Sequence, residues 1–196
     1  SGAISVAVVS SKTSAHVDGA DSLVNAATLN AGGSTEIAAE SMEDINTVTV
    51  SAAGGGVGVA GAVGVKVVKS ETTAYVGKNT QVNQTRSGAA QDVSVKASDS
   101  VKLTGGGGAA TIGAYAAGAT AEVNIVRNTT TAYLGELSAV NAGRDVTVDA
   151  RSSKDVESTA LAASGGASLG IGGAVSVVTI GAKLREESQK GLSSEG

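Results

Sequence analysis

The side chains that could carry out acid–base or nucleophilic chemistry are few and scattered. His16 is the sole histidine and there is no cysteine, so a thiolate nucleophile, a thiolate metal site and a disulfide framework are excluded. Three carboxylates cluster in the segment ESMED, at Glu40, Glu43 and Asp44. That segment has no counterpart in the repeats described below, so we expect a loop with solvated charges. General acid–base catalysis needs a positioned proton donor and acceptor. We therefore predict no catalytic residues and expect that the chain is not an enzyme.

Sites for metals and cofactors are equally weak in the sequence. The glycine runs lack the Lys-Ser/Thr that follows a phosphate-binding loop. They also lack the aspartate of the Gly-Gly-x-Gly-x-Asp calcium repeat. Asp18 and Asp21 could hold a cation only loosely. We predict no metal and no cofactor. Polysaccharide lyases also use β-helices, but they gather Asp, Arg or Lys on one face, and no such group recurs here.

The composition is unlike that of a compact globular domain. The 196 residues include 28 Gly, no Pro, Phe or Trp, and only three Tyr. Large aromatic side chains normally supply much of a globular core, so the small and β-branched residues here suit a narrow interior between closely stacked backbones. An apolar content of 41% argues against disorder. The net charge of −4 and the lack of a basic stripe argue against nucleic-acid binding.

The elements that must position these side chains belong to a repeat. SSKTSAHVDG, KSETTAYVGK and RNTTTAYLGE align without gaps, as do STEIAAES, QDVSVKASDS and RDVTVDARSS. A preserved apolar position in a repeat usually faces the shared core, so six residues are predicted to be inward-facing anchors: Val17, Val76, Leu134, Ile37, Val95 and Val148. His16 shares its position with Tyr75 and Tyr133, which indicates packing between repeats rather than a general base.

The repeat has a period of about 58 residues, which is the signature of a solenoid or a repeat array. We therefore expect one solenoid region over residues 1–184. Its units span about 4–62, 63–120 and 121–175, with a partial unit at 176–184. Residues 185–196 are charged and lack alternation, which predicts a frayed polar tail. The chain starts directly in a strand-like run, so we expect an internal segment of a longer protein.

Within each unit, apolar residues alternate with polar ones at the period of a β-strand, as at Val6/Val8 and Val93/Val95. Hairpin signals are scarce, with Asp18-Gly19 the sole Asx-Gly pair. This pattern favours an all-β parallel β-helix over a sandwich. Coils of about 19 or about 29 residues would make a rod roughly 33–50 Å long. Open end rungs would favour end-to-end association.

Glycine- and alanine-rich runs close each unit. Residues 161–182 are uncharged and long enough to cross a bilayer as a helix. Glycine disfavours helices, and the matching run in the first unit alternates like a strand, so we expect a solenoid wall and not membrane insertion. Gly54–Gly56 and Gly105–Gly108 are expected to turn or to approach a neighbouring backbone. Replacing Gly106 and Gly107 with Val should then lower stability.

NAGRDVTVDA (141–150) and AAQDVSVKAS (89–98) resemble the coils of filamentous-haemagglutinin-like exoproteins. The longer unit, a Gly/Ala/Val run followed by Thr-Thr-Ala-Tyr-Val/Leu-Gly, resembles repeats of the large leukotoxin-like and adhesin-like members of that group. The resemblance implies a right-handed parallel β-helix, exported by two-partner secretion to the surface of a Gram-negative bacterium. It also implies a role in attachment, biofilm formation or virulence.

Together these observations predict a structural and adhesive stalk segment of a secreted surface protein. The expected partners are host-cell or bacterial surface receptors or glycans. Two alternatives remain open: a leukotoxin-like segment that acts on host membranes, and a carbohydrate-active β-helix enzyme.

Overall fold

The computed structural model describes residues 1–85 and 91–181. Almost all of these residues lie in strands, with a single short 3-10 helix at Leu23–Asn25. The tail predicted at 185–196 and the last residues of the partial fourth unit lie outside the described residues. The strands are β1 (Gly2–Val17), β2 (Ala27–Leu29), β3 (Thr35–Val76), β4 (Thr80–Val82), β5 (Val93–Leu134), β6 (Ala139–Val140) and β7 (Val146–Gly181).

The strands form two parallel sheets, in the orders β1-β3-β5-β7 and β2-β4-β6. Val17 pairs with Val76, which pairs with Leu134, so each residue lies beside its equivalent in the next repeat. One sequence repeat is therefore one coil of the solenoid. The prediction of an all-β parallel solenoid built from these sequence repeats is confirmed. The two shorter coil lengths expected from the sequence, and the rod length derived from them, are wrong, because a coil takes up a whole repeat.

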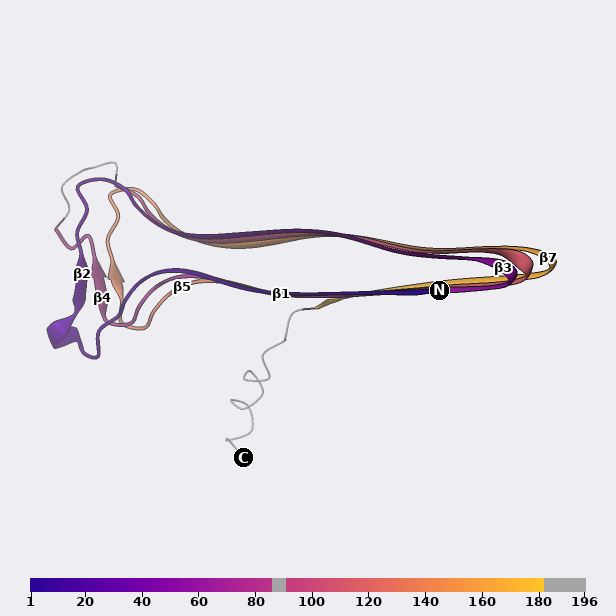
Figure 1. Ribbon diagram of the computed structural model, residues 1–196. Helices are drawn as coiled ribbons and strands as arrows, with labels where there is room; N and C mark the ends of the chain where they lie inside the picture. The colour runs from indigo at the N-terminus through magenta and orange to yellow at the C-terminus, as the bar shows by residue number, and fades with distance from the viewer. Residues whose placement is uncertain (86–90, 182–196) are drawn as a thin grey trace, which may run out of the picture.

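Each long strand doubles back on itself (Figure 1). From the end that holds β2, β4 and β6, which we call the head, a strand runs out to a tip and returns. The outgoing legs (35–53, 93–111 and 146–164) stack into one wall, the forward wall. The returning legs (2–17, 57–76, 115–134 and 169–181) stack into the return wall. At about 3.3 Å per residue and 4.8 Å per rung, the solenoid is a blade about 66 Å long but only about 14 Å deep along its axis.

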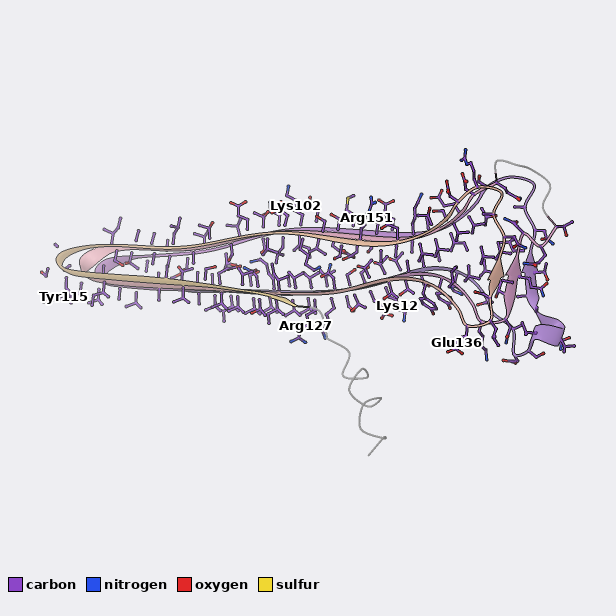
Figure 2. The ribbon with its side chains drawn as sticks, turned by 180° about the vertical axis from the view of Figure 1, so that it is seen from behind. Lys12, Lys102, Tyr115, Arg127, Glu136 and Arg151 are labelled. Atoms are coloured by element: carbon purple, nitrogen blue, oxygen red, sulfur yellow. The ribbon has the colours of Figure 1, made fainter. Side chains whose placement is uncertain are left out.

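The two walls face each other across a narrow interior. In β3 the odd-numbered residues point inward as far as Ser51, and the even-numbered ones do so from Gly58 onward, because the turn at 54–56 exchanges the faces. Side chains join the walls directly: the Thr120 hydroxyl donates to the Leu161 carbonyl at 2.7 Å, and the Asn124 amide donates to the Ser158 hydroxyl at 2.7 Å. Figure 2 shows the side chains of both walls meeting between the ribbons.

The interior changes character from head to tip. Next to the head lies an aliphatic cluster that includes Val76, Val82 and Val95. A second aliphatic cluster surrounds Leu103. A polar network separates the two clusters. Beyond the second cluster, towards the tip, the inward residues are mostly Gly, Ala, Ser and Thr, together with Asn124 and one buried ion pair.

The outer surface near the tip reverses the usual arrangement. There the valines and isoleucines of the alternating pattern point outward, and the small or polar residues, threonine among them, point inward. The expectation that β-branched side chains fill the narrow interior is therefore wrong for this half of the blade. Bulky side chains do not fit between walls that approach closely enough for direct hydroxyl contacts. The outward apolar residues include Ile4, Val6, Val48, Val50, Val57, Val59, Val63, Leu161, Ile171 and Val175.

The two glycine runs behave differently from each other. Gly55 lies at the tip with φ +139°, so the expected turn at 54–56 is present. The expectation is wrong for Gly105–Gly108, which is continuous extended strand within β5 and neither turns nor approaches a neighbouring backbone, since the atoms nearest an added Cβ all belong to side chains. Alternate glycines of this run face inward, where a Cβ at Gly107 would lie 2.7 Å from Thr120 Cγ2. A Cβ at Gly106 faces outward and would meet Val48 Cγ2 at 3.7 Å, an ordinary contact.

This difference predicts opposite effects at two adjacent glycines. Gly107→Val should lower the free energy of unfolding by about 1–3 kcal/mol, as overpacking does elsewhere. Gly106→Val should leave it unchanged or raise it, because valine is the better strand residue. Thermal and urea unfolding of the two single variants checks this. Equal destabilisation by both would show that the inward and outward faces are misassigned.

Candidate functional site

A column of aromatic rings runs along the return wall beside the head. His16 and Tyr75 stack with ring centroids 4.8 Å apart, and Tyr75 and Tyr133 stack at 4.9 Å, with ring planes nearly parallel at 3° in both pairs. The spacing equals the distance between rungs, so the ladder follows directly from the repeat. Stacking occupies the ring faces, and the ring edges and tyrosine hydroxyls remain for other contacts. His16 Nε2 also lies 3.1 Å from Asp18 Oδ1.

Beside this ladder lies a shallow hollow of about 400 Å³, lined by Tyr75, Tyr133, Lys78 and Glu136 and by three glycines. Gly77 and Gly135 directly follow the anchors Val76 and Leu134, whereas Gly19 follows Val17 by two residues and packs against Gly77 and Lys78. A Cβ on Gly135 would lie 2.6 Å from the Gly77 carbonyl carbon, so the backbones approach too closely for any side chain. Because these glycines have no side chains, the surface beside the ladder is hollowed. Its hydroxyl, ammonium and carboxylate groups can hydrogen-bond a polar ligand such as a glycan.

The ESMED carboxylates lie in a different setting from the one expected. Glu40, Glu43 and Asp44 belong to β3 and pair with Ser98, Val101 and Lys102 of β5, so the prediction of a loop without a counterpart is wrong. Glu43 points inward and is buried, and its Oε1 accepts hydrogen bonds from Ser41 at 2.6 Å and Ser70 at 3.3 Å. Glu40 and Asp44 are exposed, as predicted for solvated charge.

Glu43 is part of a polar network that crosses between rungs and walls. Asp99, one rung further on, accepts hydrogen bonds from Ser70 at 2.6 Å, from Thr72 at 3.4 Å and from the Asn128 amide. Buried carboxylates are tolerated where several donors surround them. The network joins two rungs and both walls, and its chemistry is structural because its members are buried and their hydrogen bonds are made to one another.

A second buried polar feature lies closer to the tip. The Lys66 ammonium forms an ion pair with the Glu122 carboxylate, and both side chains are almost completely buried. Burial lowers the pKa of the Lys66 ammonium from its ordinary value, because desolvation disfavours the charged form. On the opposite wall, a Cβ at Gly105 would lie 2.7 Å from Lys66 Nζ and 2.8 Å from Glu122 Oε1. The glycine run therefore provides the space that the two long side chains occupy.

The six predicted anchors occupy two ladders beside the head. Val17, Val76 and Leu134 are paired on successive rungs and belong to the first aliphatic cluster. Ile37, Val95 and Val148 form the second ladder. Ile37 and Val95 are buried, whereas Val148 is 43% exposed because no described rung covers the last strand.

The metal hypothesis for Asp18 and Asp21 finds no geometric support. Asp18 contacts His16, and Asp21 lies 3.6 Å from Lys78 Nζ. Over residues 1–85 and 91–181, no group of three potential metal ligands comes together. In the same ranges, no helix is long and apolar enough to span a membrane.

Sequence reasoning missed Lys66, Glu122 and Asp99 as interior residues. A signal was present: Lys66 stands among valines and Glu122 in a run of Ala, Thr and Val. Charges isolated in such runs would have been informative if the apolar residues had been assigned to the outer face.

No family model, curated protein or solved structure matches this chain. The likeness to filamentous-haemagglutinin-like repeats therefore rests on the sequence motifs alone.

The buried ion pair leads to a prediction about stability. Lys66→Met leaves the Glu122 carboxylate buried without its partner and should cost about 3–5 kcal/mol of unfolding free energy. Glu122→Met should have a similar effect for the complementary reason. The double variant replaces both charges with apolar groups of similar size and should recover most of the loss. A double-mutant cycle by urea unfolding measures this. Additive losses would show that the two side chains are not coupled.

Proposed function

We propose that this chain is a scaffold segment of a larger secreted surface protein, and that its stacked coils present adhesive surfaces. The observation that carries the proposal is the parallel register of whole repeats, which holds along both walls and shifts only at the tip. Each repeat adds one rung and places its outward positions beside the equivalent positions of the previous repeat. Repetition of this kind builds extended surfaces rather than a single catalytic pocket. The proposal assigns no catalytic role to any residue.

The shape of the coil refines the idea of a stalk. A whole repeat adds only about 4.8 Å along the solenoid axis, but it adds two strips of wall, each about 66 Å long. A stack of such coils gains little length along its axis for each repeat, but it gains a large area of outer surface. The hollow beside the aromatic ladder, with its row of tyrosine hydroxyls, Lys78 and Glu136, is the surface we assign to glycans or surface receptors.

A second candidate function is favoured by one observation. Outward apolar side chains cover both walls near the tip, as expected of a segment that acts on membranes. Charged side chains such as Lys12, Glu71 and Lys102 occupy outward positions on the rest of the walls, and the bilayer core disfavours them. Adhesion is therefore the function we favour.

Adhesion and membrane action can be separated with the purified chain. Beads coated with it should bind epithelial or bacterial cells more than albumin-coated beads, and removal of surface glycans should reduce the binding. Tyr75→Ala and Tyr133→Ala together should weaken binding. Thr73→Ala and Thr131→Ala, at outward positions of the same two rungs, should not. Dye-loaded vesicles should stay intact at neutral and acid pH. Leakage without cell binding would favour the membrane-acting alternative.

A further inference from the structure

The return wall carries an apolar strip that needs a covering partner. Its outward positions near the tip form six columns along the stacking direction, at residues 57, 59, 61, 63, 65 and 67 of β3 and their paired residues on the other rungs. The aliphatic columns include Val6, Val65, Val123 and Val177 at one position and Ile4, Val63 and Val175 at another. Polar side chains are rare in the strip, and Thr179 is the one at the 67 position.

Charged side chains border this strip but do not enter it. Between Asp44 and Lys69 the only charged residue is Lys66, and between Lys102 and Arg127 it is Glu122; these two are the buried ion pair. The next outward column towards the head carries Lys69 and Arg127. In Figure 2, Arg127 marks this border on the return wall and Tyr115 marks the tip. The strip is therefore an uninterrupted apolar face about 36 Å long.

The strip contains a groove as well as ridges. The column at position 61 consists of Gly2, Gly61, Ala119 and Gly173, so it has almost no side chains. A groove of about 480 Å³ runs along it, bordered by the column of Val63, Ala121 and Val175. The forward wall has no such ridge beside a groove, because its outward positions in β5 are Gly106, Gly108 and Ala110.

We infer that the return wall pairs face to face with the return wall of a second copy of this chain. A two-fold axis along the stacking direction, between columns 61 and 63, sets the ridge of each copy over the groove of the other. The same operation places column 57 over 67 and column 59 over 65. All six columns then meet apolar columns, and the interface is isologous. The two tips point in opposite directions.

This pairing leaves the charged borders in water. The column of Lys69 and Arg127 falls opposite residue 55 at the tip of the other copy, outside the apolar overlap. The solenoid axes run side by side, so added repeats would extend the contact. Columns 61 to 67 span four rungs and columns 57 and 59 span three, which gives about 600 Å² per copy, or about 1,200 Å² in total, at strand spacings. That area reaches the lower end of specific interfaces.

A second copy fits the strip better than lipid does. Sheets pack face to face at about 10 Å through interdigitating side chains, as the ridge and groove allow. Pairing covers the apolar face and leaves the bordering column of Lys69 and Arg127 in water. The inference is independent of the adhesive role, because it concerns a different part of the blade from the aromatic ladder.

Sedimentation velocity over a range of concentrations tests the pairing in the full chain. The parent chain should form dimers. Val59→Lys with Val63→Lys places two ammonium groups in the contact, where burying an unpaired charge is strongly unfavourable. The dissociation constant should rise by about a hundredfold or more.

The matched control is Val48→Lys with Val50→Lys, which makes the same change on the forward wall of the same rung. These control positions are 70% and 63% exposed, against 58% and 40% for Val59 and Val63. Circular dichroism should show the parent strand content in both variants.

Thiol cross-linking tests the register, because the chain has no cysteine. A mixture of Val57→Cys and Val67→Cys chains should be joined by a short bismaleimide, since these columns face each other. Val57→Cys alone should not form the cross-linked dimer, because its two copies would lie about 33 Å apart.

Three results would overturn the pairing. A monomer at all concentrations would do so, as would dimers that persist in the return-wall lysine variant, which would indicate end-to-end stacking. Flotation of the chain with phosphatidylcholine–phosphatidylglycerol vesicles, lost with the return-wall lysines, would show that lipid covers the strip. None of these results would bear on cell binding by the head.

Discussion

Parallel hydrogen bonding between successive coils holds every wall residue beside its equivalent one repeat away. The sequence separation of paired residues shortens along the chain, from the step between Val17 and Val76 to the step between Val95 and Val148. The residues that later repeats lack are missing from the head, outside the walls, and the strand register shifts slightly at the tip. Since equivalent positions stack, the aromatic ladder and the contact between Gly77 and Gly135 follow from this register. Gly19 packs against Gly77 from one position further along, because Asp18 occupies the aligned position.

The closeness of the two walls decides what the interior can contain. Small residues and hydroxyl groups fill most of it. A long side chain fits only where the opposite wall leaves space for it. Lys66 and Glu122 occupy the space that Gly105 leaves. Glu43 and Asp99 are accommodated because serine, threonine and asparagine donors surround them. A buried ion pair adds little net stability, but it penalises any register that would separate its partners.

The same narrowness moves the larger aliphatic residues to the outside near the tip. A strand has only two faces, so residues excluded from one face appear on the other. Near the head the walls diverge, the third strand of each coil (β2, β4 or β6) closes the space, and the aliphatic residues return to the interior. The blade therefore has a head with an ordinary apolar core and an apolar outer face towards its tip. The proposed adhesive surface lies on the head, and the proposed pairing surface lies towards the tip.

The sequence by itself determined the class of fold. Alternation at period two and the alignment of the units predicted parallel stacked strands, and the shared position of His16, Tyr75 and Tyr133 predicted their packing on successive rungs. The coil length depended on tertiary structure, because glycine runs such as Gly105–Gly108 are compatible with turns as well as with extended strand. Pairing with the next rung decides between the two. The tertiary structure also decided which face of each alternating strand is buried. Period two identifies two faces but not their environments, and only the distance between the walls places Val59 outside and Lys66 inside.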